Sequence, residues 1–249
     1  MINGTDLRNA MISAANNIAK HKSSIDKLNI FPVPDGDTGT NMSMTIGNAA
    51  AELEKVTEEK TAGEVAHIAA SALLRGARGN SGVILSLLFR GFSKGTEGMD
   101  TLGGSDLVNA LGIGVEAAYK AVMKPAEGTI LTVSRVACEK GKAAAAIDDD
   151  PVYVWSAVCE GAAEALENTP ELLPVLKKAG VVDAGGKGLC YIFEGMMSVF
   201  RDGVIIENDG DEDEKNASAS LSDDFFRNAA AEFDQEIHYT YCTEFIVGR

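Results

Sequence analysis

Eight amphipathic helical runs, with no convincing strand before residue 200, constrain this chain more than any other feature of its sequence. In residues 5–20, apolar side chains recur every three or four positions, the spacing that buries one face of a helix. The other runs cover residues 40–53, 61–75, 81–93, 105–123, 129–147, 151–168 and 186–200, with a short extra turn at Thr169 and Pro170. The pattern predicts an all-α domain, a bundle or closed barrel of eight antiparallel helices.

Two of these runs begin with a capping signal. Thr61 is followed three residues later by Glu64, the capping-box pattern that satisfies two free backbone donors at once. Asp150 precedes Pro151, a cap followed by proline at the first helical position. We therefore expect helices to begin at both positions.

The formal charge of −15 limits the classes of partner. A nucleic-acid backbone needs a basic face, so we expect no nucleic-acid partner. No apolar stretch reaches the roughly 18 residues of a membrane span, and no signal-peptide pattern opens the chain. The four cysteines form no CxxC pair, which is typical of buried, reduced thiols. These features predict a cytoplasmic protein with no membrane span.

The composition changes after residue 203. Residues 207–224 carry eight acidic side chains against the single base Lys215, which is typical of a linker that cannot bury enough apolar area to fold. The stretch "HYTYCTEFIVGR" is strand-like, but a lone strand has no pairing partner. We expect a helical domain at 1–203, an acidic linker at 204–224, and the beginning of a truncated middle domain at 225–249.

Four connections of the predicted bundle should lie at the same end if the helices run up and down. They are residues 32–39 ("PVPDGDTG"), 75–82 ("RGARGNSG"), 124–129 ("KPAEGT") and 178–188 ("KAGVVDAGGKG"). Together they hold most of the glycine, aspartate and hydroxyl residues that interrupt the helical pattern. The sequence therefore predicts a single functional site at one end of the domain.

The first of these connections contains Asp35 and Asp37, two carboxylates on a tight, glycine-containing turn. Mg²⁺ prefers one or two carboxylates together with waters and substrate phosphates, so this pair is a candidate metal site. A calcium loop of the EF-hand type is excluded, because its twelfth position is Ile46 instead of a glutamate. The structural alternative is an aspartate cap on the next helix, with the glycines forming the turn.

Two of the helix entrances are candidate phosphate sites. Thr38, Gly39, Thr40 and Asn41 place backbone amides and hydroxyls at a helix N-terminus, which is a suitable anion site. In the second connection, Gly82 permits close backbone approach, Asn80 and Ser81 should cap the following helix, and Arg78 could balance phosphate charge. The alternative is an ordinary inter-helix turn with a solvated arginine.

The other two entrances are less specific. Gly128 and Thr129 form a glycine-plus-hydroxyl helix start that could equally be a plain N-cap. Asp183, Gly185 and Gly186 lie in an apolar, glycine-rich loop. The acid could hold a ribose hydroxyl or an adenine amine, or it could be a turn residue.

The stretches "NIFPVPDGDTGTNM", "RGARGNSGVIL" and "VVDAGGKGL" resemble the nucleotide-binding domain of bacterial fatty acid kinase, which is related to the ATP/ADP-binding subunit of dihydroxyacetone kinase. The resemblance covers about residues 1–203. It implies a barrel of eight antiparallel helices with Mg²⁺ and ATP or ADP at one end. It also implies that Asp35 and Asp37 bind the metal and that residues 38–41 and 80–82 hold the phosphates.

One departure from the dihydroxyacetone kinase branch is informative. That branch resembles DGDHG with a further aspartate shortly before it, whereas this chain has Thr38 in place of the histidine. Asn29 is then the nearest plausible third metal ligand. The departure favours the fatty acid kinase branch.

The resemblance implies a reaction in which ATP phosphorylates a fatty acid carried by a separate fatty-acid-binding protein, giving acyl phosphate for phospholipid synthesis. Asp35, Asp37 and Arg78 would be the catalytic residues, and a homodimer could form through the missing middle domain. A carboxylate acceptor is already ionised at neutral pH, so no general base is needed. The alternatives are a kinase of the dihydroxyacetone type and a nucleotide-binding regulatory module without transfer activity.

Overall fold

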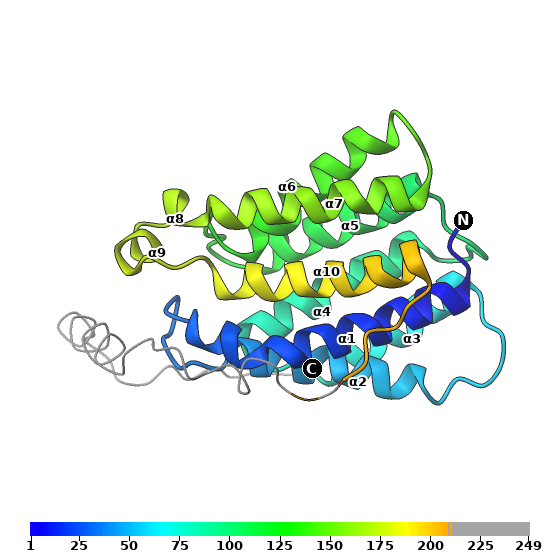
Figure 1. Cartoon of the computed structure of the whole chain (residues 1–249), viewed down its shortest axis with the longest axis horizontal. Coiled ribbons are helices and arrows are strands. Elements are labelled where there is room, and N and C mark those ends of the chain that lie inside the picture. The colour runs from blue at the N-terminus through cyan, green and yellow to red at the C-terminus, as the bar shows by residue number, and fades with distance from the viewer. Residues whose placement is uncertain (209, 211–249) are drawn as a thin grey trace, which may run out of the picture. The chain divides into compact units, whose positions relative to one another are not determined.

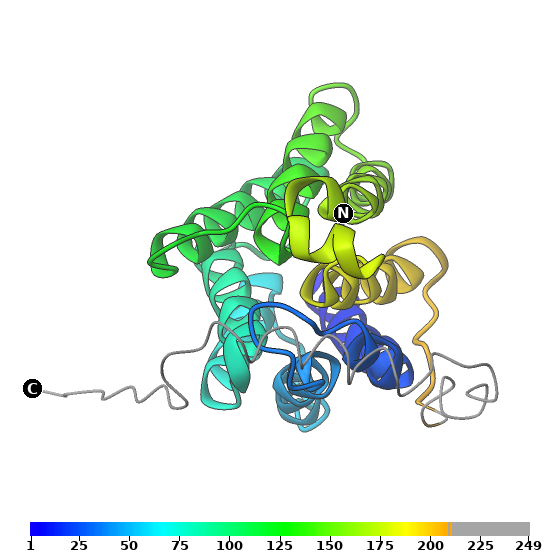
Figure 2. The same cartoon turned by 90° about the vertical axis from the view of Figure 1, so that its left-hand side faces the viewer.

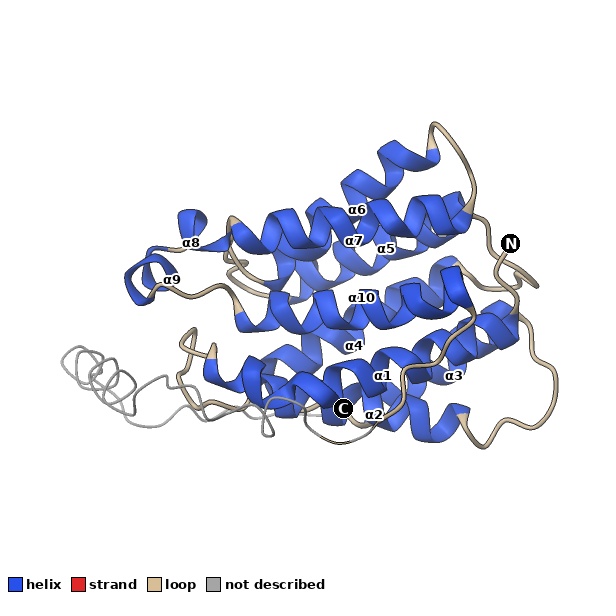
Figure 3. Cartoon of the chain, in the orientation of Figure 1, coloured by secondary structure: helices blue, strands red, loops and turns tan. Residues whose placement is uncertain are grey.

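The computed structural model describes residues 1–208 and 210, and these residues confirm the all-α architecture (Figures 1 and 3). The described residues all belong to the first of two units of the chain, Met1–Lys215. In the described part of the chain, all extended pairing is limited to one isolated bridge between Ile2 and Leu102. The predicted middle domain, and the predicted linker from residue 211 onward, lie outside the described residues.

Eight long helices build the first unit, and two short ones lie in the connection before the last. They are α1 (Gly4–Lys27), α2 (Thr38–Leu53), α3 (Ala62–Arg75), α4 (Gly79–Gly95), α5 (Gly104–Ala121), α6 (Ile130–Ala145), α7 (Pro151–Glu167), α8 (Thr169–Leu172), α9 (Pro174–Ala179) and α10 (Ala184–Asp202). Each long helix packs against the next, and α10 closes the ring against α1 (Figure 2). The arrangement is the expected barrel of eight antiparallel helices.

Small residues bring the helices close together. A Cβ on Gly195 of α10 would lie 2.6 Å from the Cα of Ala14 on α1, and one on Gly91 of α4 would lie 2.3 Å from the Cα of Gly114 on α5. The interior is apolar, and its largest side chain, Trp155, donates its indole N–H to the carbonyl of Phe193 over 3.1 Å. The largest core side chain is thus buried without leaving its indole donor unpaired.

Both predicted capping signals are present. Thr61 and Glu64 form the reciprocal capping box of α3, and the Asp150 carboxylate accepts the Tyr153 N–H over 2.8 Å at the start of α7. The first helix is longer than its apolar pattern predicts, since α1 continues to Lys27. Its last two turns expose mostly polar side chains, but Ile25 is fully buried and keeps this segment on the core. Within the described residues, no helix is long and apolar enough to cross a membrane.

Candidate functional site

The four connections predicted to share one end of the domain do lie together, at the end that faces the viewer in Figure 2. The start of α4 contacts α2, because the Arg78 N–H donates to Oγ1 of Thr45 over 3.2 Å. The start of α6 contacts the start of α10 through a hydrogen bond from the Ile130 backbone to the carboxylate of Asp183. The predicted site residues are therefore gathered around four helix starts.

The aspartate loop between α1 and α2 presents Asp35 on the surface. Its carboxylate accepts a 2.6 Å hydrogen bond from the side-chain amide of Asn29, which is buried. Gly36 turns the chain with φ +66°, a left-handed conformation that favours glycine. Asn29 thus holds Asp35 in place, and its role as a direct third metal ligand stays a prediction.

Asp37 occupies the N-cap position of α2 but makes no cap hydrogen bond. The cap is supplied instead by Asp26, whose two carboxylate oxygens accept the Thr40 N–H over 3.0 Å and the Thr40 hydroxyl over 2.7 Å. The interpretation of Asp37 as a plain helix cap is therefore wrong. The sequence does not predict this cap, because Asp26 lies 14 positions before Thr40 and reaches it only through tertiary packing.

The carboxylates in this loop repel one another. Partial burial raises the pKa of Asp37, the adjacent Asp35 carboxyl and the charge of Asp26 raise it further, and a hydrogen bond from Asn41 lowers it. Like charges this close favour protonation of one member unless a cation lies between them. The loop is thus arranged to gain from a bound cation.

Five backbone N–H groups at the starts of α2 and α4 have no acceptor among the described residues. They belong to Thr38, Gly39, Gly79, Asn80 and Ser81. The two starts are adjacent, because a Cβ on Gly79 would lie 2.5 Å from Nδ2 of Asn41 and one on Gly82 would lie 2.4 Å from Oγ1 of Thr45. Free amides that converge from two helix N-termini make an anion site.

The start of α4 differs from the prediction in one respect. The helix begins at Gly79 with Arg78 at the N-cap, so Asn80 and Ser81 lie inside the first turn and do not cap it. Gly79 has φ +59°, which lets the chain turn into the helix two residues earlier than the predicted start at residue 81. The guanidinium of Arg78 is exposed, and the described residues offer it no hydrogen-bond or ion-pair partner.

The starts of α6 and α10 are partly capped by a shared side chain, Asp183. Asp183 is buried and accepts the Gly186 N–H over 2.6 Å as well as the Ile130 N–H, so it caps two helices. Burial raises the pKa of Asp183 to about 6, although both backbone hydrogen bonds lower it. The sequence left two roles open for Asp183, a contact with the nucleotide or a structural turn residue. This geometry favours the structural role.

The glycines and the threonine at the starts of α6 and α10 also make contacts within the domain. The Gly128 N–H donates to Oγ1 of Thr132 over 2.8 Å, and Oγ1 of Thr129 donates to the Ala126 carbonyl over 2.7 Å. A Cβ on Gly185 would lie 3.2 Å from Ile130, and one on Gly186 would lie 2.7 Å from Val133. The amides of Gly128 and Gly186 are thus paired within the domain and less available to a ligand.

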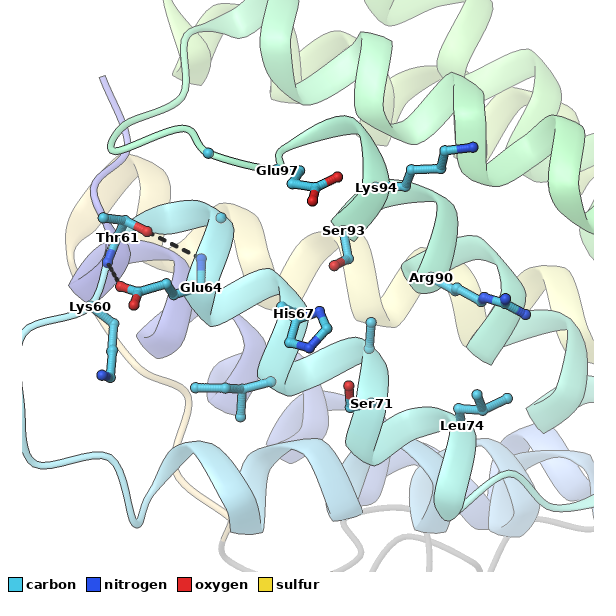
Figure 4. Close-up of a pocket in the computed structure, with 14 residues that line it drawn as sticks. Lys60, Thr61, Glu64, His67, Ser71, Leu74, Arg90, Ser93, Lys94 and Glu97 are labelled. Atoms are coloured by element: carbon cyan, nitrogen blue, oxygen red, sulfur yellow. Dashed lines mark hydrogen bonds between the residues drawn. The ribbon is translucent and has the colours of Figure 1, made fainter.

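A groove of about 700 Å³ lies elsewhere, along the outer face of α3 and α4 (Figure 4). His67 and Leu74 line it from α3, and Arg90 and Lys94 line it from α4. None of the predicted site residues lines this groove. The candidate site is therefore defined by its polar groups instead of by a deep hollow.

Comparison with known proteins supports the assignment of the fold. The DAK2 domain matches residues 32–198. The dihydroxyacetone kinase of C. freundii in complex with AMP-PNP and Mg²⁺ shares the fold, with a TM-score of 0.58 and 19% identity over 78% of this chain and 33% of that one. Its native form gives a TM-score of 0.54 and 18% identity over 80% and 35%.

Curated relatives extend well beyond this chain. Protein YloV of Bacillus subtilis is 41% identical over 99% of this chain and 44% of its own length. An uncharacterized protein of Staphylococcus saprophyticus is 42% identical over the same two shares. The chain thus spans less than half the length of these relatives. Because the family match includes the aspartate loop and all four helix starts, the chain belongs to the DAK2 domain family.

Proposed function

We propose that this chain is the Mg-nucleotide module of a kinase that transfers a phosphoryl group from ATP to a fatty acid. The observation that carries the proposal is the juxtaposition of two aspartates that are not used as caps with five free amides on two adjacent helix starts. A kinase needs both features, because a metal and fixed donors must neutralise the phosphates during transfer.

The residues fit magnesium. Among the described residues, no three acidic, histidine or cysteine side chains are grouped to hold an ion by themselves. Mg²⁺ does not need such a cage, since it takes one or two carboxylates and completes its shell with waters and phosphates. Asp35 and Asp37 would supply the carboxylates, with Asn29 the candidate third ligand. When bound, the ion would neutralise phosphate charge.

The nucleotide phosphates would lie against the starts of α2 and α4. The free amides of Thr38–Gly39 and Gly79–Ser81 would donate to phosphate oxygens, and Arg78 would stabilise the charge of the transferred group. Gly128, Thr129, Asp183, Gly185 and Gly186 would line the nucleotide without binding its phosphates. The solved relative with AMP-PNP and Mg²⁺ supports ATP or ADP as the nucleotide.

A fatty acid presented by a separate fatty-acid-binding protein is the acceptor we favour, with acyl phosphate for phospholipid synthesis as the product. Its carboxylate is ionised at neutral pH, so transfer requires positioning and charge neutralisation without a base. Thr38, where the dihydroxyacetone branch has histidine, weighs against an alcohol acceptor. That branch, and a regulatory nucleotide-binding module, are the alternatives.

The longer relatives suggest how the module works in context. We propose that the region beyond this chain contributes dimerisation and acceptor docking, and that the protein acts in the cytoplasm. Residues 1–249 alone should then bind Mg-ATP but form acyl phosphate slowly with a lipid-loaded partner. Fast transfer by this chain would contradict the second statement without affecting the first.

Titration calorimetry with ATP tests the nucleotide site directly. ATP should bind in the presence of Mg²⁺, and EDTA should abolish the binding heat. Binding of equal affinity without a divalent cation would refute the metal assignment. If Mg-ATP binds but the loaded carrier yields no acyl phosphate while dihydroxyacetone is phosphorylated, the acceptor is wrong and the nucleotide site stands.

A further inference from the structure

The α3–α4 hairpin has the opposite charge to the rest of the chain. Residues 62–95 contain four basic side chains, Arg75, Arg78, Arg90 and Lys94, against the single acid Glu64, for a net charge of +3. The whole chain carries −15. A local excess of base on so acidic a protein creates a field that attracts acidic surfaces.

These four cations are free to meet a partner. All four are exposed, and none forms an ion pair with a described residue. Other basic side chains on the helices form ion pairs, for example Arg135 with Glu127 and Lys140 with Glu164. Among the described residues, Arg75 interacts with the charge of Glu52 at longer range, and Arg78, Arg90 and Lys94 have no acidic partner within ion-pair distance.

The same hairpin is concave. The groove of about 700 Å³ runs between the two helices, with His67, Ser71 and Leu74 projecting from α3 and Arg90, Ser93 and Lys94 from α4 (Figure 4). Leu74 is 50% exposed, and Val83, near the start of α4, is 49% exposed. The hairpin surface thus combines a groove with exposed apolar side chains. Two basic side chains, Arg90 and Lys94, lie one helical turn apart along it.

We propose that the α3–α4 groove is the docking site for an acidic amphipathic helix of a partner protein. Such a helix would place its apolar stripe over Leu74 and its carboxylates against Arg90 and Lys94, in the helix-in-groove mode. Carboxylates spaced by one turn on the partner would match the spacing of these two cations. Charge complementarity fixes the acidic character of the partner.

Two other anionic partners fit the surface less well. A membrane is flat on this scale and would not fill the groove. A single phosphate would contact only one or two of the four cations. An elongated acidic helix can meet the full length of the groove.

The groove also leads toward the candidate site. Leu74 and Arg75 lie in the last turn of α3, and the short connection that follows leads to Arg78, the N-cap residue of α4. A partner seated there would lie next to the bound nucleotide. The docking itself does not depend on the proposed function, because it follows from the hairpin's shape and charge.

A synthetic amphipathic helix tests the proposal. The probe is a peptide of about 18 residues with leucines at helical spacing and glutamates flanking them. Its binding to the ¹⁵N-labelled chain is followed by amide chemical shifts at low and high salt. We expect shifts confined to α3 and α4, and binding that weakens about tenfold when Arg90 and Lys94 are both changed to glutamate.

Matched controls separate specific docking from general attraction. Lys120→Glu with Lys124→Glu makes the same charge change on exposed positions outside the hairpin and should leave binding within about twofold. A scrambled peptide of the same composition should bind weakly. Shifts outside the hairpin, equal loss in both double variants, or equal binding of the scrambled peptide would overturn the proposal. Binding only to phosphatidylglycerol vesicles would make the hairpin a membrane surface and would also overturn it.

Discussion

The starts of α2 and α4 and the starts of α6 and α10 lie at the same end of the barrel and look alike in sequence. Each combines glycine with a hydroxyl or an acid at a helix entrance. Among the described residues, the first pair leaves five amides without an acceptor, whereas the second pair directs amides to Asp183, Thr129 and Thr132 and leaves only those of the buried residues Ala184 and Gly185 open at the start of α10. The difference lies in where the capping side chain comes from.

Asp183 caps both starts of the second pair, and the amides that it leaves open at α10 belong to the buried residues Ala184 and Gly185. In the first pair, Asp26 reaches from α1 to cap Thr40, which releases Asp37 and leaves the two preceding amides open. A glycine-rich helix start is therefore an anion site only when its own side chains do not cap it. Substitutions at the two pairs of helix starts should therefore affect nucleotide binding differently.

Replacing either loop aspartate should remove most of the Mg-ATP affinity. Asp35→Ala or Asp37→Ala deletes one of only two carboxylates available to the metal, and we expect the Kd to rise about 100-fold or more, or ~2.7 kcal/mol. Both variants should stay folded: Asp37→Ala relieves like-charge repulsion, whereas Asp35→Ala also removes the acceptor of the buried Asn29 amide and should lower the thermal midpoint slightly. Calorimetry and circular dichroism measure the two effects.

Glu97→Ala is the matched control for these variants. Glu97 is an exposed acid beyond the opposite end of α4, and its loss should leave Mg-ATP affinity unchanged. Wild-type affinity in either aspartate variant would assign the metal to other residues.

Truncation of Arg78 should have the next largest effect. The guanidinium has no partner in the described structure, so Arg78→Ala should fold normally while losing a charge-assisted hydrogen bond to phosphate. We expect about tenfold weaker Mg-ATP binding, with a smaller dependence on salt. Arg201→Ala, which removes an exposed arginine paired with Asp202 at the other end of the barrel, should bind normally. Equal affinity in the two variants would place Arg78 outside the phosphate site.

The sequence was sufficient for the ring of helices because their apolar periodicity is regular and local. It was also sufficient to place the four connections at one end, since alternating direction follows from short turns. It could not show that Asp26 caps α2, because that contact joins residues 14 positions apart through tertiary packing. Nor could it distinguish the capped from the uncapped glycine-rich starts, because each depends on which side chain reaches the amides.

Gly79→Ala tests the geometry that brings α4 to α2. Its φ of +59° strains any other residue, and the new Cβ would lie 2.5 Å from the Asn41 amide. We expect a loss of about 1–3 kcal/mol in the free energy of unfolding, with severalfold weaker Mg-ATP binding as the amides shift. Denaturant titration and calorimetry measure both.

Gly47→Ala provides the contrast within α2. A Cβ at Gly47 meets nothing within 4 Å, so this change should stabilise the protein by about 0.5–1 kcal/mol and leave nucleotide binding intact. Normal ATP affinity in Gly79→Ala, despite its lost stability, would mean that the approach of the two starts is structural only.

Asp183→Asn should change stability and its pH dependence while leaving nucleotide binding nearly intact. Burial raises the pKa of Asp183 to about 6 in the folded protein, above the ordinary value of 3.8. The folded state then favours the protonated acid, so the wild type should lose stability relative to Asp183→Asn as the pH rises from 4 to 6. Two units of pKa correspond to about 3 kcal/mol at most. Above pH 7 the difference should be constant. Denaturant titrations of both proteins across this range measure the effect. A tenfold loss of Mg-ATP affinity in this variant would show that the α6–α10 side binds the nucleotide directly, and the contrast between the two pairs of helix starts would then be wrong.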